Sequence, residues 1–325
     1  MQNPIVKIVV PTRAQADTSI AVYLLKKYGG EKFPGVTTAE ISVAPMLKEG
    51  TTFESALAQG ELLIDLAGGL FDHHNHATKI TVSTMVAQQL GILHNPSIKK
   101  MLVYAERDDF YGKGTISNDP IDRAFGLSAL LTVLNKKYVS NPVETFNIIL
   151  PIITAHHEEE LRRTEEMPKE LKEKLANGSA ENFSVIQRGK QLKVLLIDTD
   201  NPSMAGYVRS VMGGGYDVAA LRLSSGHLNI LTRPAKQVDL QSLAVILRTE
   251  EASKKKIEIS HNPVDLAQTG RYEPIPEWYY DPATNSLQNG GIVPGDVPAT
   301  GITKLEARKL LELGLSEQLW NPLSK

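Results

Sequence analysis

The strongest constraint on the fold is the alternation of strand and helix patterns at the start of the chain. Residues 5–10 form a nearly continuous apolar run, which is typical of a strand buried on both faces. A helical pattern follows over residues 17–28 and ends at Gly29-Gly30. Strand patterns return at residues 39–44 and 61–66. Strands that alternate with helices favour a mostly parallel sheet, so we expect a three-layer α/β domain.

Helical patterns fill the rest of the first half of the chain, at residues 81–90, 96–107 and 120–138. A longer helical stretch over residues 143–175 is interrupted by Pro151 and Pro168. Its charged second part, and His156-His157 before it, are interpreted as a solvated helix, because adjacent helical residues point about 100° apart. Asn177-Gly178-Ser179 then breaks the pattern. We therefore expect one domain over residues 1–178 and a second over residues 179–325.

Shorter elements characterise the second domain. Strand patterns at residues 183–187 and 192–198 flank Arg188-Gly189-Lys190, and those at 218–223 and 227–232 flank Ser224-Ser225-Gly226. Helices are expected at residues 203–212, 239–253 and 304–313, with an irregular Pro/Gly-rich segment before the last of them. This pattern predicts a smaller α+β domain.

Composition restricts the chemistry available to the chain. The sequence has no cysteine, which excludes thiolate metal sites, iron–sulfur clusters and cysteine nucleophiles. A formal net charge of −2 argues against a protein whose main task is to coat nucleic acid. No window reaches the roughly 18 apolar residues of a membrane span, and the start lacks a signal-peptide layout. We therefore expect a cytoplasmic protein with no membrane partner.

One segment concentrates side chains that bind metals. Asp65 lies at the end of the third strand pattern, and Asp72, His73, His74 and His76 lie in the loop after it. Ligands bind beyond the carboxyl ends of parallel strands, so this position is typical of a functional loop. Imidazole and carboxylate together suit a divalent ion such as Mn²⁺, Fe²⁺ or Zn²⁺. The alternative is a polar surface loop in which histidines recur by chance.

Two further acidic positions could join this segment. Asp17 opens the first helix, where a carboxylate can also simply cap backbone N–H groups. Asp108 and Asp109 lie at the end of a later helix, where charged residues are ordinary. Together with Asp65, they place acidic residues behind two strands and a helix, at one edge of the expected sheet.

These motifs resemble the DHH superfamily of metal-dependent phosphoesterases. The finer resemblance is to the melanocyte-proliferating-gene family, described as metal-dependent hydrolases and linked to 3′–5′ exonuclease activity. It rests on Asp65-Leu66-Ala67-Gly68-Gly69, on Phe71-Asp72-His73-His74 and on the frame that begins at Ala16-Asp17. The motifs that carry it lie within residues 5–110.

The resemblance implies which residues hold a metal. Asp17, Asp65, His73 and either Asp108 or Asp109 would bind one or two divalent ions, with Mn²⁺ expected first and Mg²⁺, Fe²⁺ or Zn²⁺ as alternatives. His74 would face the substrate phosphate as a hydrogen-bond donor or general acid. Asp72 would orient a neighbouring imidazole.

Two departures from the family pattern bear on activity. Gln15 stands where the family has a metal-binding histidine, and His76 is an additional histidine that could replace it. Gly213-Gly214-Gly215-Tyr216 stands where many second domains of the superfamily have Gly-Gly-Gly-His. One-metal catalysis, altered specificity and a non-catalytic binding protein therefore remain as alternatives.

Basic residues of the second domain could bind a phosphate-containing substrate. The candidates are Arg209, Arg222, His227 and Arg233, because guanidinium groups match phosphate oxygens, although such residues are also common on solvated surfaces. We therefore expect a metal-dependent phosphodiesterase or exonuclease that acts on an oligonucleotide or nucleotide in a cleft between the domains. The alternatives are a phosphatase or pyrophosphatase for small molecules, and a regulatory binding protein. The sequence leaves a homo-oligomer open.

Overall fold

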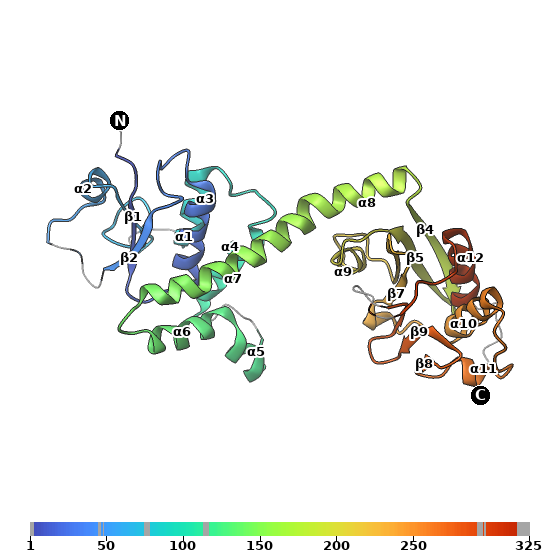
Figure 1. The fold of residues 1–325 in the computed structure, drawn as a ribbon. Coiled ribbons are helices and arrows are strands. Elements are labelled where there is room, and N and C mark those ends of the chain that lie inside the picture. The colour runs from blue at the N-terminus through green and yellow to red at the C-terminus, as the bar shows by residue number, and fades with distance from the viewer. Residues whose placement is uncertain are drawn as a thin grey trace. The chain divides into compact units, whose positions relative to one another are not determined.

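The computed structural model describes residues 3–44, 47, 49–74, 79–112, 117–290, 295 and 297–316. The chain forms two compact units, Met1–Thr164 and Glu165–Lys325, hereafter the first and second units (Figure 1). The division falls inside the long helical stretch and thus upstream of Asn177, where the sequence predicts the boundary. The second unit contains nearly as much of the chain as the first, whereas the sequence predicts a smaller domain.

The first unit contains a parallel sheet of three strands. Strand β1 (Lys7–Pro11) lies between β2 (Glu40–Ala44) and β3 (Glu61–Leu63), and both pairings are parallel. Ile8 and Val10 of β1 are completely buried, as the apolar run predicts. The expected α/β class and parallel sheet are therefore confirmed.

Helix α1 (Ala16–Tyr28) packs against α3 (Val82–Leu90), α4 (Lys99–Tyr111) and α7 (Val143–Leu161). The single helix expected over residues 120–138 is wrong. Gly126 adopts an extended conformation with φ −65° and ψ 151°, which separates α5 (Pro120–Phe125) from α6 (Leu127–Lys137). A short helix, α2 (Phe53–Ala58), precedes β3.

The long helical stretch passes through Pro151 without a break. Pro151 lies inside α7, which continues through a π-helical segment, η1 (Arg162–Glu166), into α8 (Met167–Ala176). Pro168 lies two residues after the end of the π-helical segment, and its missing N–H cannot donate to a preceding carbonyl group. The interruption expected at Pro151 is therefore wrong, whereas the helix is irregular near Pro168.

The second unit is built on a mixed sheet of seven strands. Along the sheet the order is β4 (Ala180–Gln187), β5 (Lys190–Asp198), β6 (Val218–Arg222), β7 (Leu228–Thr232), β10 (Ser286–Gln288), β9 (Ile275–Asp281) and β8 (Gly270–Tyr272). Strands β5 and β6 pair parallel, and all other neighbours pair antiparallel. The expected hairpin between β4 (Ala180–Gln187) and β5 (Lys190–Asp198) is confirmed, with Arg188 and Gly189 at positive φ in its turn. The hairpin between β6 (Val218–Arg222) and β7 (Leu228–Thr232) is also confirmed.

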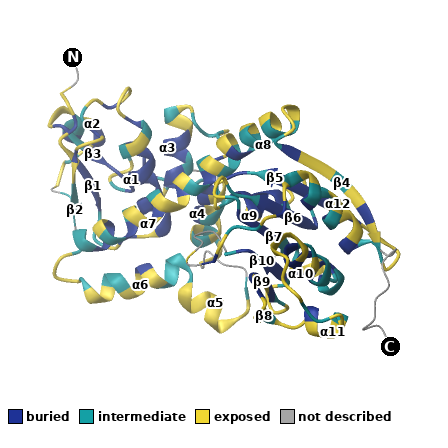
Figure 2. Cartoon of the chain, turned by 45° about the vertical axis from the view of Figure 1, so that its right-hand side comes forward, coloured by how far each residue is buried: buried dark blue, intermediate teal, exposed yellow. Residues whose placement is uncertain are grey.

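Apolar side chains cover both faces of this sheet. Along β5, Val194 and Leu196 join the core formed with α10 (Gln241–Lys255) and α12 (Lys304–Leu315). Leu195 and Ile197 point to the opposite face, where they join a core with α8 and α9 (Met204–Arg209). Strands β5 and β6 accordingly consist mainly of buried residues (Figure 2).

The segment expected to be irregular also contains regular structure. It holds α11 (Pro263–Leu266), β8 (Gly270–Tyr272), β9 (Ile275–Asp281) and β10 (Ser286–Gln288). The sequence does not predict β9 because a proline such as Pro276 normally argues against a strand. In the structure the register of β8 against β9 shifts between Arg271 and Tyr272, and Tyr272 pairs with Ile275, so the ladder is irregular beside Pro276. Across the described residues, no helix combines the length and the apolarity that crossing a bilayer requires.

Candidate metal centre

The loop after β3 folds back on itself through residues in left-handed conformations. Asp65, Ala67 and Gly68 have φ values of 60°, 65° and 61°. The backbone N–H of Asp65 donates to the carbonyl oxygen of Phe71 at 2.7 Å, which closes the loop. Left-handed non-glycine residues are uncommon and concentrate at functional sites. The loop therefore holds Asp65 in a strained conformation at the end of the strand.

Aromatic packing fixes this loop to the body of the first unit. Phe71 is buried and makes edge-to-face contacts with Phe33 and Phe53. A Cβ atom on Gly69 would lie 2.6 Å from Phe53, so only glycine fits there. Anchoring at Phe71 places the next residues, Asp72 to His74, over Asp65.

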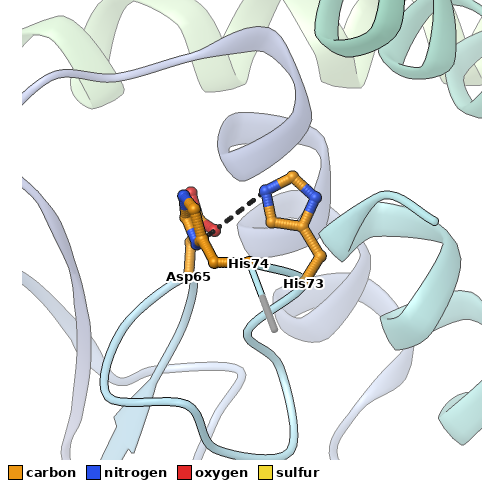
Figure 3. A group of neighbouring side chains, drawn as sticks. All are labelled: Asp65, His73 and His74. Atoms are coloured by element: carbon orange, nitrogen blue, oxygen red, sulfur yellow. Dashed lines mark ion pairs between the residues drawn. The ribbon is translucent and has the colours of Figure 1, made fainter. Parts of the chain in front are cut away.

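Asp65, His73 and His74 converge in this loop (Figure 3). One ligand atom from each of the three lies within 4.8 Å of the others. The Oδ1 atom of Asp65 is 3.4 Å from His73 Nε2 and 3.4 Å from His74 Nδ1. The three side chains could therefore surround a single cation.

The hydrogen bonds of His73 leave one ring nitrogen for a ligand. Its Nδ1 lies 3.0 Å from the carbonyl oxygen of Ile80, which can only accept, so Nδ1 carries the proton in this bond. Nε2 then presents a lone pair toward Asp65. A histidine that donates one N–H to a backbone carbonyl while the other nitrogen binds the ion is the usual arrangement of a metal ligand.

Asp65 is 7% exposed, and its Oδ1 accepts no hydrogen bond in the described structure. Its Oδ2 accepts a hydrogen bond from the hydroxyl of Thr18 at 3.3 Å. Burial raises the pKa of Asp65, and the charges of His73 and His74 oppose this shift. A buried carboxylate oxygen without a donor, facing an imidazole lone pair, fits a divalent cation.

Asp72 holds His74 in place. Its Oδ1 accepts from His74 Nδ1 at 2.7 Å and from the His74 backbone N–H at 3.1 Å, and its Oδ2 accepts from the Gly68 N–H at 2.7 Å. Burial alone would raise the pKa of Asp72, but these hydrogen bonds outweigh burial and lower it. The bond to Asp72 also raises the pKa of His74, whose side chain is 63% exposed. His74 is thus oriented, solvent-accessible and stabilised in its protonated form.

The two aspartates at the end of α4 point to different neighbours. Asp109 Oδ2 lies 3.5 Å from His73 Nδ1. Asp108 accepts a hydrogen bond from the hydroxyl of Ser128 and borders a separate cavity with Gln15. Among the described residues, the structure therefore brings Asp109 close to His73.

Asp17 acts as a cap for a helix distant in sequence. Its two carboxylate oxygens accept from the backbone N–H groups of Val82 and Ser83 at 2.8 and 2.9 Å, at the start of α3. Burial raises the pKa of Asp17, and the hydrogen bonds from Ser83 and Val82 oppose the shift. Its neighbour Thr18 donates a hydrogen bond from its hydroxyl to Asp65 instead. No motif signals Thr18, because its partner is distant in the chain.

Gln15 does not belong to this cluster. It is an exposed residue at the N-cap of α1 and is not among the described residues that converge on Asp65. His76, the other candidate ligand, lies outside the described residues.

The side chains of the second unit that could bind substrate make hydrogen bonds or ion pairs with other residues of that unit. His227 uses both ring nitrogens, with the Ser225 hydroxyl at 2.9 Å and the Val297 carbonyl at 2.8 Å. Arg209 donates to the carbonyl oxygens of Ala205 and Thr232.

The other two arginines, Arg222 and Arg233, lie close to aspartates. Arg233 donates to the Gly215 carbonyl at 3.2 Å and lies 3.8 Å from Asp217. Arg222 lies 3.8 Å from Asp198. About a third of each of these two side chains is exposed, so both are more accessible to an anion than the buried His227.

His157 departs from the interpretation of a solvated helix. It is buried in the first unit, with the hydroxyl of Tyr23 2.7 Å from Nδ1 and the hydroxyls of Tyr28 and Ser97 3.0 Å from Nε2. Its neighbour His156 is exposed. Only every third or fourth residue of α7 faces the core. In the charged part of the helix, the sequence does not show which positions these are.

Comparison with known proteins gives no family for the chain. No family model matches it, and no curated protein sequence matches it.

Proposed function

We propose that this chain is a metal-dependent phosphoesterase whose centre is formed by Asp65, His73 and His74. The observation that carries the proposal is the buried Oδ1 of Asp65, which has no hydrogen-bond donor and faces two imidazoles at 3.4 Å. Phosphoester hydrolysis needs charge neutralisation at the phosphate and a hydroxide available near neutral pH, and a bound divalent ion supplies both. The DHH-like layout, Mn²⁺ as the ion and a phosphodiester of nucleotides as the substrate belong to this proposal.

Within this mechanism the protein side chains have separate roles. Asp65 Oδ1 and His73 Nε2 would hold the ion, and the Ile80 carbonyl keeps His73 in the required tautomer. Asp72 orients His74 and favours its protonated form, so His74 can donate a hydrogen bond to a phosphate oxygen or a proton to the leaving alkoxide.

A non-catalytic metal-binding protein is the second candidate. Asp17, which the resemblance makes a ligand, uses both oxygens to cap α3. Gln15 provides no imidazole. These two observations favour a reduced site, and a reduced site can bind an ion without catalysing hydrolysis.

Hydrolysis assays with three substrates test the proposal. Protein stripped with chelator and reloaded with Mn²⁺ is incubated with bis(4-nitrophenyl) phosphate, 4-nitrophenyl phosphate or pyrophosphate. We expect hydrolysis of the diester that requires added metal. Asp65→Asn should reduce the rate by at least about 100-fold, because loss of even an outer partner of a metal ligand costs about 10–100-fold.

Asp122→Asn is the matched control, because Asp122 is an exposed carboxylate on α5 of the same unit. This variant should keep the wild-type rate. Metal binding without hydrolysis of any substrate would support the non-catalytic candidate. Preference for the monoester or for pyrophosphate would reassign the substrate class.

A further inference from the structure

A cavity of about 660 Å³ lies between helices α4, α6 and α7 of the first unit. Its wall is mainly apolar and includes Met101, Val103, Leu127, Ile152 and Ile153. Sites for small organic molecules have volumes of roughly 300–1,000 Å³ and mostly apolar walls with a few polar groups. This cavity, hereafter the α4–α7 cavity, meets both criteria.

The charged groups that line the α4–α7 cavity all have the same sign. They are Lys99, Lys100 and Arg107, and the remaining titratable side chains there are His156 and Tyr104. Lys100 is paired with Glu160 at 2.7 Å. Among the described residues, Lys99 and Arg107 form no ion pair. An apolar wall with two unpaired cations beside it is complementary to an amphipathic anion.

One apolar residue of the cavity wall, Ile152, is exposed in the described structure. The side chain of Ile152 on α7 is 52% exposed and contributes to the cavity lining. Covering such a side chain with hydrocarbon is favourable by about 25 cal/mol per Å² of apolar surface removed from water. Hydrocarbon that covers Ile152 would therefore bind favourably in the same cavity that Lys99 and Arg107 line.

We propose that the α4–α7 cavity binds a small organic anion with a carboxylate or phosphate on a hydrocarbon body. The anionic group would lie against Lys99 or Arg107, which are eight residues apart on α4, and the hydrocarbon would cover Ile152 and Val103. This inference is independent of the phosphoesterase proposal, because the cavity shares no lining residue with Asp65, His73 and His74.

Calorimetric titration of the full chain with decanoate tests this inference, with 1-decanol as the uncharged analogue of the same length. We expect one decanoate to bind per chain, about tenfold or more tightly than decanol. The double variant Lys99→Gln/Arg107→Gln should bind decanoate only as well as decanol. Ile152→Asp, which places a like charge in the wall, should abolish decanoate binding.

Matched controls exist in the same unit. Lys137→Gln removes a cation on α6 outside the cavity, and Ile121→Asp changes an exposed isoleucine on α5 that is 69% exposed. Both should bind decanoate as the wild type does.

Three results would overturn the assignment. One is equal affinity for decanoate and decanol, and another is decanoate binding that survives Ile152→Asp. The third is a wild-type dimer that Ile152→Asp converts to a monomer in analytical ultracentrifugation, because the cavity wall would then be an interface between copies of the chain.

Discussion

At the scale of single residues, the two adjacent histidines of the loop have different partners. His73 donates through Nδ1 to a backbone carbonyl and directs Nε2 toward Asp65, whereas His74 donates through Nδ1 to Asp72. The ring of His73 is mostly buried and that of His74 mostly exposed. A ligand role for His73 and a substrate-facing role for His74 follow from these environments.

We expect His73→Ala to lose metal and activity together, because it removes a ligand nitrogen. His74→Ala should keep the metal but slow turnover by about 100-fold or more, within the range that general acids contribute. Metal content measured by elemental analysis and turnover measured on the same samples separate the two roles. Equal loss of metal in both variants would contradict this division.

A second prediction concerns stability and the buried His157. Burial lowers its pKa below the ordinary value of 6.5, with smaller contributions from Lys27 and His156. Above this value the residue is neutral in both the folded and the unfolded chain. Below it the unfolded chain takes up a proton that the folded chain resists, so His157 makes the protein less stable as pH falls below 6.5.

Thermal unfolding at about pH 7.5 and about pH 5.5 measures this effect as a difference between variants. His157→Gln should be less stable overall, yet it should lose less stability on acidification than the wild type does. His156→Gln, the exposed neighbour, should retain the wild-type pH dependence. If His157→Gln and the wild type have the same pH dependence, the buried imidazole is not the responsible group.

Among the candidate ligands, the sequence predicts positions better than roles. Asp65, His73 and His74 are close in the chain, so a local motif is enough to predict their proximity. Asp17 is different, because the backbone groups that it caps belong to Val82 and Ser83. An aspartate at a helix start can cap its own helix or bind a metal, and the sequence suggests both. Capping of the distant helix α3 depends on the tertiary fold, which the local sequence does not show.

At the scale of elements, capping by Asp17 gives a stability prediction that needs no metal. In the presence of chelator, Asp17→Ala should reduce the free energy of unfolding by about 1–3 kcal/mol, because it leaves two buried N–H groups of α3 without an acceptor. Asp119→Ala is the control. Asp119 caps α5, a helix with no buried residue, so its loss should leave global unfolding nearly unchanged. An Asp17→Ala variant as stable as the wild type in chelator would contradict the capping role.

The loop after β3 supplies the next prediction. Gly69→Ala should weaken metal binding although Gly69 offers no ligand, because the new methyl group would meet Phe53 at 2.6 Å and displace the loop. Gly206→Ala in α9 is the control, since no atom lies within 4 Å of the added Cβ. Calorimetric titration with Mn²⁺ compares the two variants. Unchanged affinity in Gly69→Ala would mean that the loop does not position the ligands.

Element prediction succeeds where the pattern is local. The apolar run at residues 5–10 predicts β1, and the strand patterns around Arg188-Gly189-Lys190 predict a hairpin. In the structure Arg188 and Gly189 form its turn with positive φ. It fails where one residue changes the outcome, as at Gly126, whose extended backbone divides a continuous helical pattern. It also fails in β9, where Pro276 lies near an irregular register that tolerates a missing N–H.

At the scale of the whole molecule, each unit has its own apolar core. One core is confined to the first unit, and the two cores on the faces of the seven-stranded sheet lie within the second. The candidate metal centre belongs entirely to the first unit. Binding of metal should therefore stabilise the first unit selectively, by about 2.7 kcal/mol at a free concentration 100 times the dissociation constant.

Differential scanning calorimetry of the full chain tests this division. We expect two transitions, of which Mn²⁺ raises only one. Leu62→Ala should lower the midpoint of the metal-sensitive transition, and Leu196→Ala should lower that of the other. Each substitution should reduce the free energy of unfolding of its unit by about 2–5 kcal/mol, because the two leucines are completely buried in different cores. A single transition that both substitutions shift equally would contradict independent units.

The most direct measurement of the central claim is calorimetric titration of chelator-treated protein with Mn²⁺, for the wild type and Asp65→Asn. The claim is that the buried Oδ1 of Asp65 and Nε2 of His73 hold a divalent ion. The wild type should bind Mn²⁺ at this centre, and Asp65→Asn should lose that binding while keeping its fold by circular dichroism. Absence of Mn²⁺ binding in the wild type, or equal binding in a folded Asp65→Asn variant, would contradict it.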